Sequence, residues 1–369
     1  MNRLFRWDQM GLFLLALAAG ILPFAVPEVC AAALREGLTL CSGPLLLSLF
    51  PFLVVSRLLI QCPESDLLAL PFRLAAWGIG IRTPCAARVL CIGFLGGFAP
   101  AASAAAQAVR TGQLTAEEAD ALLPACICSG PSFVVLTVGQ SLLGSAELGV
   151  LLFASQITAN YLTAALLNRF AGVRSVKPGS AVPASHAPPR LDEILADAAI
   201  TYCKLCGFIL FFRMLAAGAG ALLPAGAGTL CAILLEVCSG CDLASRTGRW
   251  GSLLCCAALS VQGLSVLLQV RTICPPEMTL RPLYRSRLLH LPLSLALFYL
   301  LLPGGEADVF STLSARVLLM RRVPPDCALL VFAVCCMAAC TLRSGIRQVE
   351  QKQMARNAGG CCINSKTLL

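Results

Sequence analysis

The sequence predicts an all-α, polytopic membrane protein with about eight transmembrane helices and two re-entrant hairpins, arranged as an inverted repeat. Of its 369 residues, 58% are hydrophobic and only 13% are charged, whereas charged residues make up about 25% of a typical soluble domain. Apolar runs of roughly 17–25 residues, the length that crosses a bilayer, recur along the chain. The eight clear runs lie at about 10–28, 37–60, 121–141, 147–169, 196–222, 252–270, 288–303 and 327–343.

Two further apolar segments, 87–109 and 225–241, are rich in Gly and Ala; the first also contains Pro100 and Ser103, and the second Ser239. Such segments make poor straight helices, and irregular backbone at membrane depth is tolerated only where protein or a water-filled cavity surrounds it. We therefore expect each segment to be a re-entrant hairpin. Full spanning is the alternative that the composition leaves open.

The distribution of Lys and Arg favours the hairpins. If 87–109 and 225–241 are re-entrant and the N-terminus is cytoplasmic, most of the basic residues face the cytoplasm, as the positive-inside rule requires. If both segments span, the two sides become nearly equal in basic residues. The hairpin arrangement also makes the units 37–141 and 196–270 enter the membrane from opposite sides, which is an inverted repeat. A weak gap-free match between 41–53 and 203–215 supports this repeat.

These boundaries divide the chain into six segments. The net charge of +9 is scattered between the apolar runs, so it sets topology and does not predict nucleic-acid binding. The segments are an N-terminal membrane helix (1–34), a first repeat unit (35–170), a cytoplasmic linker (171–192), a second repeat unit (193–270), C-terminal membrane helices (271–343) and a basic flexible tail (344–369).

Four short motifs occur between residues 35 and 270. They are SLFPFLVVS at 48–56, GQLTAEEA at 112–119, CSGPS at 128–132 and LEVCSG at 235–240. In this order and spacing they resemble the YlbJ-type sporulation integral membrane proteins. Those proteins carry the nucleoside-recognition Gate domain, which is related to concentrative nucleoside transporters. The resemblance implies movement of dipicolinate, a small aromatic dicarboxylate, across a forespore membrane during endospore formation.

Two positions depart from the family pattern. Gly97 is followed by Phe-Ala-Pro, where the family usually has Tyr-Pro-Gly, and Ile127 and Cys128 replace an Asn that often precedes Ser-Gly-Pro.

In the first unit, the candidate solute-binding residues centre on Ser129-Gly130-Pro131. Ser is a good helix N-cap and Pro is favoured in the first turn, so the motif predicts a half-helix that starts inside the membrane. The free N–H groups and positive end of such a helix suit a carboxylate. A proline kink that only shapes packing is the alternative. Further candidates in this unit are Ser132, Gly97 and Pro100.

In the second unit, Arg213 and Glu236 lie in apolar surroundings, where a charged group is costly and a functional candidate. We expect Arg213 to pair with a solute carboxylate or with Glu236. For Glu236, the sequence leaves open a structural ion pair with Arg213 or Lys204, or a role as a proton or coupling-ion site. Further candidates here are Ser239, Gly240, Ser260 and Gln262, of which the last two align with the Ser-Gly-Pro region of the first unit.

The sequence contains no nucleophile elbow, phosphate-binding loop or paired acid–base carboxylates, so we expect no enzyme activity, no cofactor and no metal. The expected function is transport of a small anionic solute by an integral multi-pass protein, with the lipid bilayer as its other partner. By resemblance, it lies in the cell membrane or the mother-cell-derived forespore membrane. A nucleoside-type carrier, a non-transporting scaffold of a sporulation complex, and a homo-oligomer all remain open.

Overall fold

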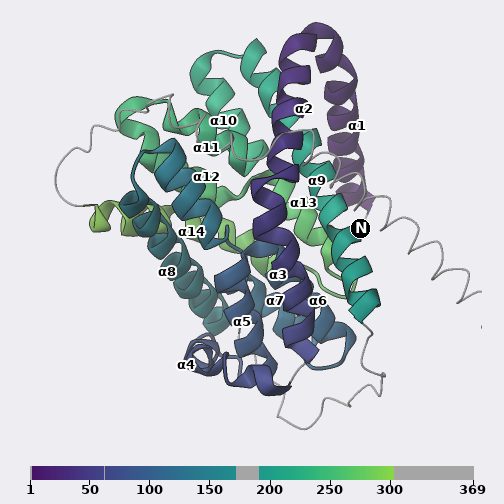
Figure 1. Cartoon of the computed structure of the whole chain (residues 1–369), viewed down its shortest axis with the longest axis vertical. Coiled ribbons are helices and arrows are strands. Elements are labelled where there is room, and N and C mark those ends of the chain that lie inside the picture. The colour runs from purple at the N-terminus through teal and green to yellow at the C-terminus, as the bar shows by residue number, and fades with distance from the viewer. Residues whose placement is uncertain (1, 62, 172–190, 303–369) are drawn as a thin grey trace, which may run out of the picture.

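The computed structural model describes residues 2–61, 63–171 and 191–302, and every regular element within these ranges is a helix (Figure 1). The all-α prediction is therefore confirmed for this part of the chain. In order, the elements are α1 (Asn2–Ala25), α2 (Pro27–Ser42), α3 (Pro44–Gln61), η1 (Pro63–Asp66), α4 (Leu70–Gly78), α5 (Pro84–Gly96), α6 (Phe98–Arg110), α7 (Ala116–Cys126), η2 (Ser132–Leu142), α8 (Ala146–Ala171), α9 (Leu191–Leu222), α10 (Ala225–Leu235), α11 (Val237–Ser245), η3 (Gly248–Trp250), α12 (Gly251–Val261), α13 (Gly263–Ile273) and α14 (Arg281–Leu301).

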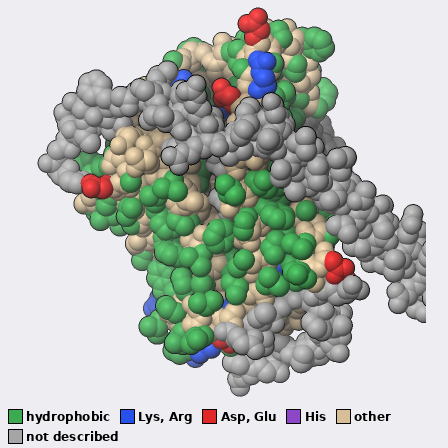
Figure 2. Space-filling model, viewed as in Figure 1, with side chains coloured by type: hydrophobic (Ala, Val, Ile, Leu, Met, Phe, Trp, Pro, Cys, Tyr) green, Lys and Arg blue, Asp and Glu red, His purple; other side chains and the backbone are tan. Residues whose placement is uncertain are grey.

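Four helical stretches of the described chain are long and apolar enough to cross a membrane, which indicates an integral membrane protein. Hydrophobic side chains cover much of the face drawn in Figure 2, and the charged side chains visible there lie mostly toward its margins. Such a surface suits a lipid environment. The four stretches are Pro27–Leu47, Ala146–Ala171, Leu191–Leu222 and Gly248–Ile273.

The prediction of about eight spans is thus confirmed only as membrane character, with four candidate spans among the described residues. The apolar part of α1, Phe13–Ala25, is shorter than a span. The expected run 121–141 is divided between α7 and η2, because the backbone leaves the helix at 127–131. The expected run 327–343 lies outside the described residues.

The chain reverses between α5 and α6 and again between α10 and α11. A Cβ placed on Gly93 would lie 3.2 Å from the Cβ of Ala101, although residues eight apart in a straight helix are separated by about 12 Å. Likewise, a Cβ on Gly240 would lie 2.8 Å from the Cα of Ile233. The turns fall at Gly97 (φ 80°) and at Glu236, within the two segments predicted to be hairpins.

Each hairpin is followed by an interrupted helix. Helix α7 begins with a capping box between Thr115 and Glu118, and it ends at Cys126; the next helix, the π-helix η2, starts at Ser132. Helices α12 and α13 are separated by Gln262, which adopts a left-handed conformation (φ 66°). Few contacts join α7 to η2 or α12 to α13, so the chain continues past each interruption and does not fold back.

The main core lies where α5, α6, α7, α8, α12 and α14 meet, and α6 supplies an almost completely buried row of alanines. Small side chains let helix backbones approach closely, which is how membrane helices associate. Asp120 of α7 fastens the start of α14 to this core. Its carboxylate accepts hydrogen bonds from the backbone N–H groups of Thr279 (2.8 Å) and Leu280 (3.1 Å), and from the Thr279 hydroxyl (2.6 Å).

Candidate functional site

In the first unit, the tip of the hairpin meets the interruption of the following helix. A Cβ placed on Gly97 would lie 2.6 Å from the backbone nitrogen of Gly130 and 3.2 Å from the carbonyl oxygen of Cys128. Only glycine permits so close an approach at this tip. Gly97 and the Ser-Gly-Pro motif, which are far apart in the sequence, are therefore brought together.

The Ser-Gly-Pro motif lies at a helix start as expected, but Ser129 does not cap that helix: the N-cap residue of η2 is Pro131, and no side chain caps it. Ser129 is buried in the interruption, Pro131 already has helical dihedrals (φ −60°, ψ −37°), and Ser132, which is exposed, opens the next helix. Pro100 is buried and contacts Gly96, one turn away in the same hairpin. The structure thus has a helix starting at this motif, and its role in binding an anion stays a prediction.

The second unit repeats this contact between a hairpin tip and an interruption. Gly263 follows Gln262 and also has a positive φ (69°). A Cβ placed on it would lie 2.9 Å from the backbone nitrogen of Glu236 and 3.0 Å from the carbonyl oxygen of Leu235. Both hairpin tips therefore touch the interrupted helix that follows them in the sequence.

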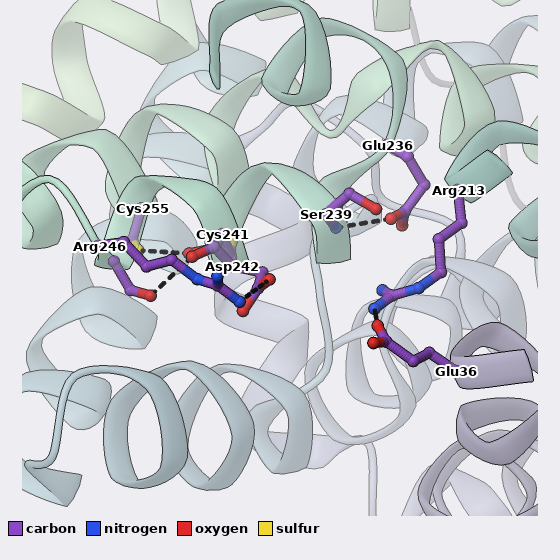
Figure 3. Close-up of polar contacts among 9 residues, drawn as sticks. Glu36, Arg213, Glu236, Ser239, Cys241, Asp242, Arg246 and Cys255 are labelled. Carbon is purple, nitrogen blue, oxygen red and sulfur yellow. Dashed lines mark hydrogen bonds and ion pairs between the residues drawn. The ribbon is translucent and has the colours of Figure 1, made fainter. Parts of the chain in front are cut away.

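Glu236 caps the start of α11. Its carboxylate accepts hydrogen bonds from the backbone N–H groups of Cys238 (2.8 Å) and Ser239 (2.7 Å), and the residue is 2% exposed (Figure 3). A negative charge at this position interacts favourably with the positive end of the helix. Gly240, one turn further on, contacts the Ile233 backbone and keeps the two helices of the hairpin close together.

Neither of the ion pairs expected for Glu236 is present. Arg213 instead pairs with Glu36 of α2, with 2.7 Å between Nη2 and Oε2 (Figure 3), and Lys204 is exposed. The structural explanation by an Arg213 or Lys204 partner is therefore wrong, because the α11 backbone already satisfies the Glu236 carboxylate. Arg57, another basic residue in an apolar run, pairs with Asp197 at 2.6 Å.

The two polar candidates at the second interruption have different surroundings. Gln262 donates from Nε2 to the carbonyl oxygen of Leu259 (3.0 Å), and its buried Oε1 has no hydrogen-bond partner. A non-glycine residue with positive φ is uncommon and is a sign of strain held by its surroundings. Ser260 faces α8 and α14, where its hydroxyl contacts Gln156 and Ser294.

Ser260 belongs to a buried polar cluster that the sequence analysis missed. We call it the Arg287 cluster. Gln156 of α8 donates to the Ser260 hydroxyl (3.0 Å), and His290 Nε2 lies 3.2 Å from the carbonyl oxygen of Gln156. Its members are Gln156, Asn160, Ser260, Arg287, His290 and Ser294, and all are buried.

Arg287 is the charged member of the cluster. Its Nη2 donates to Asn160 Oδ1 (3.2 Å) and its Nη1 to the carbonyl oxygen of Ser260 (3.4 Å), while Nε has no acceptor. The residue is 8% exposed, and no acidic side chain in the described ranges forms an ion pair with it.

A signal for this cluster was present in the sequence. Gln156 and Asn160 stand one turn apart in an apolar run, as do Arg287 and His290, so each pair shares one helix face. By its position just before the apolar run 288–303, Arg287 is predicted to belong to the cytoplasmic segment 271–287. Its burial depends on the contact of α14 with α8, which no local pattern reveals.

Comparison with protein-family models, with curated proteins and with solved structures finds no match to this chain. The resemblance to the YlbJ-type proteins therefore rests on the four motifs alone. The geometry described above, and not a relative, must carry the functional argument.

Proposed function

We propose that the chain is an integral membrane transporter of a small anionic solute. The observation that carries this proposal is the repeated contact between a hairpin tip and an interrupted helix, at Gly97 with Gly130 and at Glu236 with Gly263. Discontinuous helices that meet inside a membrane protein are a recurrent plan of secondary transporters, because their free backbone groups face the transported solute.

In this proposal, the two hairpins are re-entrant and the units 35–170 and 193–270 form an inverted repeat. The matching order of elements supports the repeat, since α5–α6 with α7–η2 parallels α10–α11 with α12–α13. Two such units can rock against each other around a fixed site, which exposes the site alternately to the two sides of the membrane.

The solute class follows from charge. The helix start at Ser132 and the buried Arg287 both favour an anion. The motif resemblance narrows this class to dipicolinate, moved across a forespore membrane during endospore formation. A scaffold has no evident need for a buried cluster of polar side chains around a cation.

Deletion in a spore-forming host tests the solute assignment. Spores that lack the protein are expected to contain much less dipicolinate, and re-expression of the intact chain should restore the content. Normal dipicolinate in the spores of the deletion strain would show that this solute is not the one carried. Nucleoside uptake measured in the same strains tests the nucleoside-carrier alternative.

A further inference from the structure

Arg287 hydrogen-bonds residues near the middle of two candidate membrane spans. It donates hydrogen bonds to Asn160 and to the carbonyl oxygen of Ser260. Asn160 lies near the middle of the candidate span Ala146–Ala171, and Ser260 near the middle of the candidate span Gly248–Ile273. A guanidinium at this depth is costly and marks a functional site by default.

The charge of Arg287 is not neutralised by the described part of the protein. Arg57 is equally buried, at 8% exposure, but it pairs with Asp197, and Arg213 pairs with Glu36. Within the described ranges, Arg287 donates hydrogen bonds to one side-chain amide and one backbone carbonyl. A buried cation in such surroundings is poorly compensated unless an anion joins it.

A structural role explains only part of this geometry. The carbonyl of Ser260 lies at the C-terminal end of α12, where a positive charge is favourable. That contact occupies Nη1 and leaves Nε without an acceptor, as is also the case for Arg57 and Arg213; what Arg287 lacks, unlike them, is a carboxylate partner among the described residues. Nε–H and Nη2, which also donates to Asn160, form an edge of the guanidinium, and a carboxylate binds such an edge through two parallel hydrogen bonds.

The surroundings of Arg287 connect it to the first interruption. Asn160, which accepts from Arg287, donates from Nδ2 to the carbonyl oxygen of Ile127 (3.3 Å). Ile127 shortly precedes Ser129-Gly130-Pro131. The cation therefore lies beside the interruption where the next helix begins.

We propose that Arg287 binds a carboxylate of the transported solute, with Asn160, Gln156 and His290 beside it. This inference rests on the proposed transport function and specifies its binding site. Because Arg287 is 8% exposed, the site is occluded in this structure. The ligand class is a small organic carboxylate, and an uncharged analogue of the same shape is rejected.

Binding to the purified full-length protein tests the assignment. The probe is radiolabelled dipicolinate, which is pyridine-2,6-dicarboxylate. The uncharged competitor is unlabelled pyridine-2,6-dicarboxamide. The variants are Arg287→Gln, Arg287→Lys and, as the matched control, Arg57→Lys, since Arg57 is equally buried. Gel filtration and thermal unfolding identify any variant that fails to fold.

Loss of a charged hydrogen-bonded pair is expected to weaken binding roughly 100-fold in Arg287→Gln. Arg287→Lys keeps the charge but loses the two parallel bonds, so we expect roughly a tenfold loss. Arg57→Lys should stay within about twofold of wild type, and the dicarboxamide should not compete. If Arg287→Gln does not fold, the affinity of Arg287→Lys for the dicarboxylate tests the inference instead.

The contrary outcomes are distinct. Binding by folded Arg287 variants within twofold of wild type overturns this inference and leaves the transporter proposal intact. Equal competition by the dicarboxamide overturns carboxylate recognition. Absence of dicarboxylate binding by the folded wild-type protein overturns both the inference and the dicarboxylate assignment.

Discussion

At the scale of single residues, two buried carboxylates serve as anchors for helix ends. Glu236 accepts N–H groups at the start of its own helix, α11, and Asp120 accepts them at the start of a distant one, α14. Neither has an ion-pair partner among the described residues. Backbone N–H groups at helix starts stabilise each charge instead.

Replacement of Glu236 should therefore weaken the second hairpin. Glu236→Ala removes the acceptor of two N–H groups, and we expect a loss of about 1–2 kcal/mol in stability. Glu236→Gln keeps one acceptor oxygen and should lose less stability, so its effect on uptake reports whether the charge itself is needed. Thermal unfolding and vesicle uptake measure the two effects. Unchanged stability and full uptake by Glu236→Ala would show that Glu236 is needed neither for folding nor for transport.

Asp120→Asn should loosen the start of α14. The amide oxygen of Asn can still accept a hydrogen bond, but its NH₂ group replaces the second carboxylate oxygen. That oxygen accepted the Leu280 N–H, so two donors would now face each other. We expect a loss of about 1–3 kcal/mol in stability. The control is Glu117→Gln on the exposed side of the same helix. Thermal unfolding that is equal for the two variants would show that the Asp120 contacts contribute little.

At the scale of elements, the contact of each hairpin tip with an interruption depends on a glycine. Gly97 has φ 80° and ψ −164°, a backbone conformation that residues with a side chain rarely adopt. A Cβ there would also collide with the Gly130 backbone. Gly263 has φ 69°, and a Cβ on it would collide with the backbone of Glu236. These two positions keep the hairpins in place.

Gly97→Ala and Gly263→Ala should each reduce uptake strongly and lower stability by about 2 kcal/mol or more, since the backbone cost adds to a collision. Gly80→Ala is the matched control, because Gly80 also has a positive φ (88°) but open space around it. The loss of stability in Gly80→Ala should be limited to about 1 kcal/mol. If the three variants have similar unfolding temperatures and uptake, the close approach of hairpin tip and interruption contributes little to stability or transport.

At the scale of the whole molecule, composition was enough to predict helices, membrane character and the places where the chain reverses. The reversals at Gly97 and Glu236 fall inside the two segments rich in Gly and other small residues, which make poor straight helices. The interruption at Gln262 was not predicted, since Gln-Gly within an apolar run does not by itself end a helix. The Arg287 cluster escaped prediction because it forms from three helices that are distant in sequence.

The membrane orientation of the whole chain gives a separate prediction. The linker 171–192 lies largely outside the described residues, and its basic flanks place it in the cytoplasm by the positive-inside rule. A single cysteine at Ser180, on a background from which the native cysteines are removed, should react with an impermeant reagent only after the cells are opened. Labelling from outside intact cells would contradict the re-entrant arrangement of the hairpins, on which the inverted repeat depends.

The central claim is that this protein carries a small organic anion across a membrane. The most direct test is uptake of radiolabelled pyridine-2,6-dicarboxylate into vesicles that contain the purified full-length protein, compared with protein-free vesicles and with uridine. We predict saturable uptake of the dicarboxylate above the protein-free level, with none of the uridine. Uptake of uridine alone would assign a nucleoside carrier, and uptake of neither solute by folded protein would contradict the account.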